Sequence, residues 1–163
     1  MAESIEVIAT TVSGSIRDWS KVERIVPLFE KSGWPDVRLH VVDSHVEARS
    51  ATREALGGGS RIVISAGGSG TFRAVLEGCC DSGVPLRELR LGFLRKGSAD
   101  LIGKVLGMPD DIEAAIDMFS RAIRDGLTVP CDVLEASEDS GAETPRHFVG
   151  YGGAELFGRI PHF

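Results

Sequence analysis

The stretch Ile64–Cys79, with the sequence ISAGGSGTFRAVLEGC, decides how this chain folds. Residues 60–66 are short, apolar and rich in β-branched side chains, which predicts a buried strand. Residues 71–83 have helical periodicity, so a helix is expected directly after four small residues, GGSG. A strand that passes through a tight turn into a helix is the repeating unit of α/β proteins.

The same alternation of strands and helices continues over residues 5–126. Apolar β-branched runs predict strands at 5–11, 36–43, 60–66 and 88–95. Helical spacing predicts helices at 17–33, 45–59, 71–83, 98–107 and 109–126. Pro27 is expected to kink or split the first helix, whereas Pro109 suits the start of the last and Gly126 its end. The predicted fold class is therefore α/β, a doubly wound and mainly parallel sheet with helices on both faces.

The pattern changes after residue 126. Residues 127–137 and 146–153 predict an antiparallel hairpin around a polar loop, so we expect an α/β domain over 1–126 and the incomplete start of a β-rich second lobe over 127–163. An unpaired hairpin edge favours association of copies into a homo-oligomer. The apolar residues expected to be exposed there are Phe148, Tyr151, Leu156 and Phe157.

Composition limits the classes of function. The chain has 163 residues, a net charge of −6 and a pI of about 5.2, which argues against nucleic-acid binding and against a strongly basic membrane-docking face. Three cysteines are not a disulfide framework and are expected to be reduced core thiols. Neither a signal peptide nor an apolar run of membrane-spanning length is found, so we expect a cytoplasmic protein, with peripheral membrane contact left open.

The glycine-rich turn predicts a phosphate cradle. Gly67, Gly68 and Gly70 allow close approach to the backbone, and the first N–H groups of the helix attract an anion. Ser69 and Thr71 add hydroxyl groups. Taken alone, such a turn is equally well explained as a capped junction between strand and helix. It matches neither the Walker A motif nor the dinucleotide fingerprint.

Two further turns between strands and helices carry similar residues. The first strand is followed by TTVSGS, which contains Ser13 and Gly14, and the fourth by RKGSAD, which contains Gly97 and Ser98. Because the carboxyl ends of neighbouring parallel strands meet at one edge, these turns are expected to lie beside the central one. Three such turns favour the phosphate site over a plain junction.

In order and spacing, the three turns resemble the motifs of the diacylglycerol kinase and sphingosine kinase superfamily. The family's Asn-Pro-x-Ser-Gly corresponds to Thr10–Gly14, and its Gly-Gly-Asp-Gly-Thr to Gly67–Thr71. Its third motif, Gly-Thr-x-Asn-Asp, corresponds to Gly97–Leu101. The hairpin resembles the start of the family's second lobe, so the resemblance covers essentially the whole chain.

The resemblance implies a nucleotide-binding lobe that uses ATP and Mg²⁺. The implied reaction transfers the γ-phosphoryl group to the hydroxyl of a lipid such as diacylglycerol or a sphingoid base. Ser44 corresponds loosely to a family Thr near the adenine or ribose. The residues implied to bind the nucleotide are Ser13, Gly14, Ser44, Gly67, Gly68, Ser69, Gly70, Thr71, Gly97 and Ser98.

Departures from the family pattern leave the catalytic residue unassigned. The family's motif Asp, taken to organise Mg²⁺-nucleotide or to activate the acceptor, is Ser69 here, which supplies neither charge nor a base near neutral pH. The family's Asn and Asp in the third motif are Asp100 and Leu101. We predict no metal-ligating side chain. Two alternatives stay open, namely a non-catalytic nucleotide-binding or regulatory module and an NAD kinase-like enzyme.

Overall fold

The computed structural model describes residues 3–12, 19–95, 105, 107–137 and 145–149. The chain forms two compact units, Met1–Val129 and Pro130–Phe163. The first unit holds the sheet and its helices, and the second holds a short hairpin. Each unit is described by itself.

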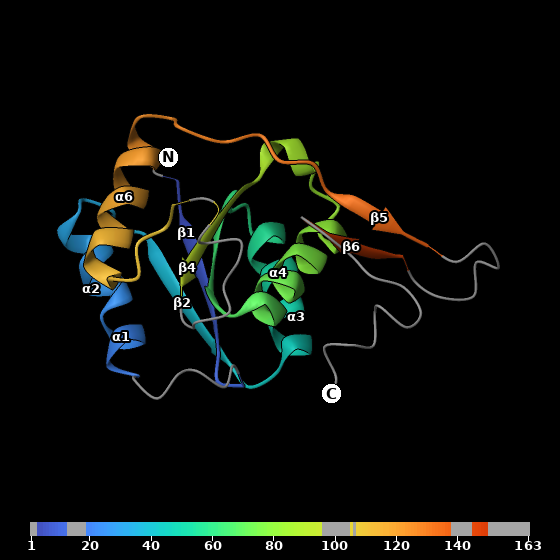
Figure 1. The fold of residues 1–163 in the computed structure, drawn as a ribbon, viewed down its shortest axis with the longest axis horizontal. Coiled ribbons are helices and arrows are strands. Elements are labelled where there is room, and N and C mark those ends of the chain that lie inside the picture. Colours follow the sequence, from blue (N-terminus) through green and yellow to red (C-terminus); the bar gives the residue numbers. More distant parts are fainter. Residues whose placement is uncertain (1–2, 13–18, 96–104, 106, 138–144, 150–163) are drawn as a thin grey trace. The chain divides into compact units, whose positions relative to one another are not determined.

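The first unit is built on a parallel sheet of four strands. Its strands are β1 (Ile5–Thr10), β2 (Val37–Val42), β3 (Ile62–Gly67) and β4 (Arg90–Arg95), in the order β2-β1-β3-β4 (Figure 1). All three pairings are parallel. Every residue of β1 and β3 is buried, which agrees with their continuous apolar sequences. The predicted parallel α/β sheet is confirmed.

Register places the ends of three strands at one edge of the sheet. Ala9 of β1 lies opposite Ala66 of β3, and Gly67 of β3 lies opposite Arg95 of β4. The chain therefore leaves β1, β3 and β4 at the same level. In open α/β sheets this carboxyl edge is where ligands bind.

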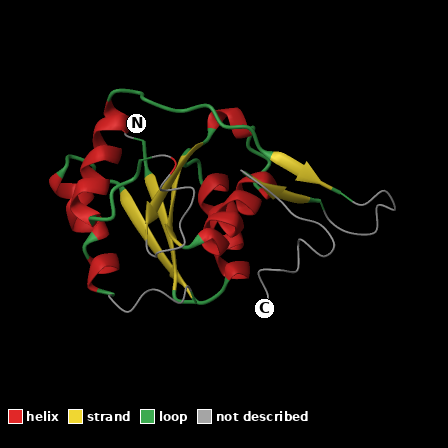
Figure 2. Cartoon of the chain, in the orientation of Figure 1, coloured by secondary structure: helices red, strands yellow, loops and turns green. Residues whose placement is uncertain are grey.

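Helices cover both faces of the sheet (Figure 2). One face carries α1 (Ser20–Glu23), α2 (Ile25–Lys31) and α6 (Ile112–Arg124), and the other carries α3 (His45–Gly57) and α4 (Ser69–Asp81). Successive strand residues point to opposite faces, so Ile5 and Val7 join the first core whereas Ile8 joins the second. A short 3₁₀ turn, η1 (Leu86–Glu88), precedes β4.

The helix expected over 17–33 is two helices, as Pro27 suggested. The break lies at Arg24, between α1 and α2, and Pro27 occupies the third position of α2. The first N–H groups of a helix have no partner within it, so a proline there removes no hydrogen bond. Gly33 follows α2 with a φ of +90°, and the Trp34 N–H bonds the Phe29 carbonyl at 3.0 Å, which closes the helix.

The start of α6 was predicted wrongly at Pro109. Asp111 is the N-cap, because its Oδ1 accepts a hydrogen bond from the Ala114 N–H at 2.9 Å. The predicted end is confirmed, since Gly126 has a φ of +66° and the Leu127 N–H reaches the Ala122 carbonyl at 2.8 Å. Of the helix expected over 98–107, only residues 105 and 107 are among those described.

The second unit contains the predicted antiparallel hairpin in shorter form. Its strands are β5 (Leu134–Ala136) and β6 (Arg146–Phe148), with Leu134 opposite Phe148. The strand was expected to begin at residue 127, but residues 127–133 form no strand. Pro130 lies in this segment and has no N–H to donate to a neighbouring strand. Phe148 is half-buried, and the other apolar residues expected to be exposed lie outside the described residues.

The cysteines differ in environment. Cys79 is a buried free thiol, as predicted, and burial raises its pKa to about 12. Cys80 is partly buried. Cys131 is exposed, so the prediction of a core thiol is wrong there. It follows the end of α6 by several residues, in a segment without helix or strand.

Close packing of α3 against α4 depends on Gly78. A Cβ at this position would lie 2.5 Å from the Arg49 carbonyl oxygen and 2.7 Å from the Thr52 Cβ. The Arg49 guanidinium also pairs with both oxygens of Asp81, with Nη2 at 2.8 Å from Oδ1. Gly78 therefore sets the distance between the two helices that carry the turns after β2 and β3.

Replacing Gly78 by Ala is expected to destabilise the chain by about 1–3 kcal/mol, because α3 must move away from α4. Gly57→Ala is the matched control: Gly57 is also helical, but a Cβ there meets no atom within 4 Å. The control is expected to change the free energy of unfolding by less than about 1 kcal/mol. Urea denaturation measures both. Equal stabilities would show that the close approach at Gly78 is not required.

Candidate nucleotide site

The glycine-rich motif forms the end of β3 and the first turn of α4. Gly67 is the last residue of β3, Gly68 is the N-cap of α4, and the helix begins at Ser69 rather than at residue 71 as predicted. The Phe72 N–H bonds the Gly68 carbonyl at 3.0 Å. The N–H groups before Phe72 have no partner within the helix and lie at the carboxyl edge of the sheet. This arrangement attracts anions.

A pair of buried threonines fixes this turn to the sheet. Thr71 Oγ1 lies 2.7 Å from Thr10 Oγ1, and both residues are 0% exposed. A Cβ at Gly67 would lie 2.3 Å from Thr71 Oγ1, so the glycine is needed for the threonine to lie there. The hydroxyl of Thr71 therefore faces the end of β1. This placement is different from the phosphate contact expected from the sequence.

Gly70 lies against His45, the first residue of α3. A Cβ at Gly70 would lie 2.8 Å from Cε1 and 2.9 Å from Nε2 of the imidazole. Both His45 and Gly70 are exposed, so the imidazole lies beside Gly70 at the surface. The turn after β2 is thus brought against the turn after β3.

Gly68 differs from its neighbours because nothing in the described structure requires a glycine there. Its φ of −90° and ψ of −172° are extended backbone that any residue adopts. A Cβ at Gly68 would meet no atom within 4 Å. Open space therefore lies beside the N-terminus of a helix of 13 residues. Of the motif's three glycines, Gly68 alone leaves room for another molecule.

Ser44 is the N-cap of α3. Its Oγ accepts a hydrogen bond from the Glu47 N–H at 3.1 Å, and Glu47 in turn accepts one from the Asp43 N–H at 2.9 Å. Asp43 also accepts a bond of 2.9 Å from the Thr11 hydroxyl. Ser44 thus lies in the turn after β2, next to His45, which contacts Gly70. The Ser44 side chain caps α3.

The structure brings some of the predicted site residues together. Gly67, Gly68, Ser69, Gly70 and Thr71 form one turn, and the side chain of Ser69 is exposed. Ser13, Gly14, Gly97 and Ser98 lie outside the described residues. Within the described part of the chain, no three His, Cys, Asp or Glu side chains are grouped as metal ligands.

Sequence reasoning missed the roles of Thr10 and His45. Thr10 is a polar residue at the end of an apolar strand, and it is buried. Its position in the sequence could have indicated a structural role for its hydroxyl. Its pairing with Thr71 depends on β1 and β3 being neighbours, which the sequence did not specify. His45 follows a predicted strand, but its contact with Gly70 depends on the close packing of α3 and α4.

Comparison with known families agrees with this geometry. The model of the diacylglycerol kinase catalytic domain matches residues 4–136, more than half of the chain. The chain therefore belongs to the diacylglycerol kinase catalytic domain family. The match includes the sheet, both helix layers and β5.

Solved structures share the fold. A crystal structure described as a "putative diacylglycerol kinase" from Bacillus anthracis strain Sterne superposes with a TM-score of 0.68 at 18% identity, over 90% of this chain and 48% of that one. A second, a diacylglycerol kinase from the same strain, has a TM-score of 0.68 at 18% identity, over 90% and 44%. The chain thus spans slightly less than half the length of these proteins. A search of curated proteins found no match. Among the described residues, no helix has the length and apolarity needed to cross a membrane.

Replacing Thr71 by Val is expected to lower the free energy of unfolding by about 1–3 kcal/mol, because the buried hydrogen bond between the Thr71 and Thr10 hydroxyls is lost. Thr71→Ser keeps the hydroxyl and is the control, with a smaller loss expected from the missing methyl group. Thermal unfolding followed by circular dichroism compares the two. A valine variant as stable as the serine variant would contradict a stabilising role for the hydroxyl pair.

Proposed function

We propose that this chain is the ATP-binding lobe of a lipid kinase that transfers the γ-phosphoryl group of ATP to a lipid hydroxyl, as in diacylglycerol kinases. The single observation that carries the proposal is the open space at Gly68, beside the free N–H groups of α4. Membership of the diacylglycerol kinase catalytic domain family supports the choice of nucleotide and of acceptor.

In this proposal the phosphates of ATP lie against the N-terminus of α4. The N–H groups of Ser69, Gly70 and Thr71 bind phosphate oxygens, and the helix dipole stabilises their charge. The buried pair of Thr10 and Thr71 positions these groups before the nucleotide arrives. Donors that are held in place lose little entropy on binding, which favours phosphoryl transfer.

Mg²⁺ would neutralise the charge of the transferred phosphoryl group. The described residues of this edge fit the triphosphate better than the metal. They offer the Ser69 hydroxyl and the carboxylate of Asp43, which already accepts a hydrogen bond from Thr11. Three grouped ligands are not present among the described residues. We therefore propose only that Mg²⁺ accompanies the nucleotide.

The proposed division of labour places nucleotide binding in residues 1–126 and the start of the lipid-binding lobe in 127–163. The relatives are about twice as long as this chain, so their second half would present the lipid and the groups that activate it. Association of copies through the hairpin and peripheral contact with a membrane are part of the same proposal.

A nucleotide-binding module without catalysis is the second candidate. The observation that favours it is the exposed Ser69, where the family motif has Asp. A hydroxyl donates a hydrogen bond to a phosphate but does not act as a base near neutral pH. No observation at the site favours the NAD kinase-like alternative.

Replacing Gly68 by Asp tests the nucleotide site without weakening the helix. Asp is a favourable N-cap, so stability is expected to stay equal or to rise. Its carboxylate would fill the open space and repel the triphosphate, so the affinity for Mg-ATP is expected to fall by more than about tenfold. Calorimetric titration measures the affinity, and thermal unfolding measures the stability.

Gly68→Asn is the matched control, because it adds the same volume and also caps the helix, but carries no charge. Its loss of affinity is expected to be smaller than that of Gly68→Asp. Unchanged ATP binding in the folded Asp variant would overturn the assignment of this turn to the phosphates.

Replacing Ser69 by Asp separates the two candidate functions. The change is made in a chain that includes the second lobe, and phosphate transfer from ATP to diacylglycerol is measured beside ATP binding. A lipid kinase that has Ser at this position is expected to show transfer with Ser69 and faster transfer with Asp. Binding without any transfer in either chain would favour the non-catalytic module.

A further inference from the structure

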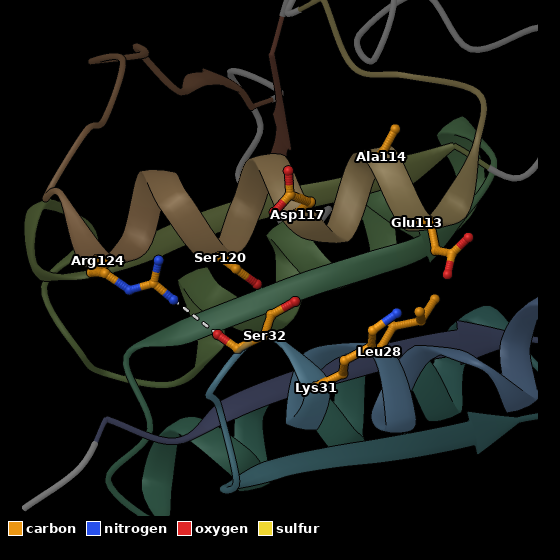
Figure 3. Close-up of a pocket in the computed structure, with 8 residues that line it drawn as sticks. All are labelled: Leu28, Lys31, Ser32, Glu113, Ala114, Asp117, Ser120 and Arg124. Atoms are coloured by element: carbon orange, nitrogen blue, oxygen red, sulfur yellow. Dashed lines mark hydrogen bonds between the residues drawn. The ribbon is translucent and has the colours of Figure 1, made fainter.

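A second candidate site lies between α2 and α6, on the face of the sheet that α4 does not cover. The groove has a volume of about 570 Å³ and is lined by side chains from both helices (Figure 3). Leu28 and Ala114 are apolar, and the other lining residues are polar or charged. Neither the glycine-rich turn nor any other proposed nucleotide-binding residue lines this groove.

A buried hydroxyl in the groove has no partner. Ser120 is 1% exposed, and its Oγ forms no hydrogen bond with the described part of the chain. In Figure 3 the Ser120 oxygen points from α6 toward α2. An unsatisfied buried hydroxyl is costly, so native structures supply most such groups with a partner. Because this oxygen is shielded from solvent, a ligand in the groove would supply a partner only after the Ser120 side chain turns toward it.

Both carboxylates of the groove already have cationic partners. Glu113 pairs with Arg24 at 3.4 Å, and Asp117 pairs with Arg121 at 2.8 Å. Neither arginine is among the residues that line the groove. The negative charge at this site is therefore neutralised from its rim.

The two cations of the groove lack carboxylate partners among the described residues. Lys31 extends from α2 toward α6 in Figure 3 and forms no ion pair there. Arg124 donates one hydrogen bond, from Nη2 to the Ser32 carbonyl at 2.8 Å, which fixes its guanidinium across the gap. Since a guanidinium carries five N–H donors, most of them stay available. The groove itself is lined by two cations and two carboxylates, and both carboxylates are paired with arginines outside it.

We propose that the groove between α2 and α6 binds a phosphate group, with Lys31 and Arg124 supplying charge and Ser120 donating a hydrogen bond to a phosphate oxygen. Charge-assisted hydrogen bonds from Arg and Lys are the strongest that a protein offers to such a group. The ligand is a phosphate monoester in free solution or the phosphate of an anionic lipid headgroup. This site is separate from the proposed ATP site.

The first test is a titration of the ¹⁵N-labelled chain with inorganic phosphate at constant ionic strength. Amide signals of residues 32–33 and 120–124 report the groove, and those of residues 67–71 report the nucleotide turn. Binding to the groove is expected with a dissociation constant on the order of 1 mM. Shifts confined to 67–71, or an absence of shifts in the groove, would overturn the proposal.

Lys31→Met removes the charge and keeps most of the aliphatic side chain. It is expected to weaken phosphate binding at the groove by about fivefold or more. Lys21→Met is the matched control, because it removes the same charge from an exposed residue of α1 outside the groove. The control is expected to stay within about twofold of the parent chain. Equal losses in both variants would show a general charge effect and contradict a specific site.

Ser120→Ala removes the unpartnered hydroxyl and is expected to weaken phosphate binding while leaving stability unchanged or raised. The affinity for Mg-ATP, measured by calorimetry, is expected to be unaffected by Lys31→Met. A negative result for the groove can therefore be distinguished from a negative result for the nucleotide site. Unchanged phosphate binding in Ser120→Ala would remove the hydroxyl from the proposed site.

Vesicles distinguish the source of the phosphate. Co-sedimentation with phosphatidylglycerol and phosphatidylcholine vesicles, but not with phosphatidylcholine alone, is expected to depend on Lys31 if the ligand is a lipid headgroup. If the ligand is a free phosphate monoester, the Lys31→Met and Lys21→Met variants will bind vesicles equally. Their affinities for inorganic phosphate will still differ. If Lys31→Met weakens neither phosphate binding nor vesicle binding, both forms of the proposal are overturned.

Discussion

The contact of Thr71 with Gly67 and Thr10 is the constraint on which the site depends. A side chain on Gly67 would overlap the Thr71 hydroxyl, and that hydroxyl is bonded to the end of β1. The first turn of α4 is therefore attached to two neighbouring strands rather than to one. Its free N–H groups are directed to the carboxyl edge as a result, where the chain also leaves β4.

The described residues include three kinds of glycine. Gly33, Gly59 and Gly126 follow helices with positive φ, which glycine adopts without strain. The motif glycines are not among the residues with positive φ. Gly67 is bare because the buried Thr71 lies against it, a Cβ at Gly70 would displace only the exposed ring of His45, and Gly68 faces open space. Only the last kind of glycine argues for a ligand, and the sequence does not separate the three.

Much of the fold was predictable because its signals are local. Buried strands are continuous apolar runs, and helices end at glycines that close their last turn. Local competition explains the errors. Asp111, and not Pro109, begins α6 because its carboxylate satisfies the Ala114 N–H. The helix α4 begins two residues early because Gly68 already accepts the first helical hydrogen bond. Pairing of Thr10 with Thr71, and the unpartnered Ser120 between α2 and α6, depend on packing that no local pattern encodes.

In the proposed function, the glycine-rich turn binds the phosphates of ATP at the start of α4. The most direct measurement is a map of backbone amide shifts on titration with Mg-ATP. We expect saturable shifts that are largest for Gly68, Ser69, Gly70 and Thr71 and extend to Thr10 and His45. Saturable binding with the largest shifts elsewhere, and none in residues 67–71, would contradict it.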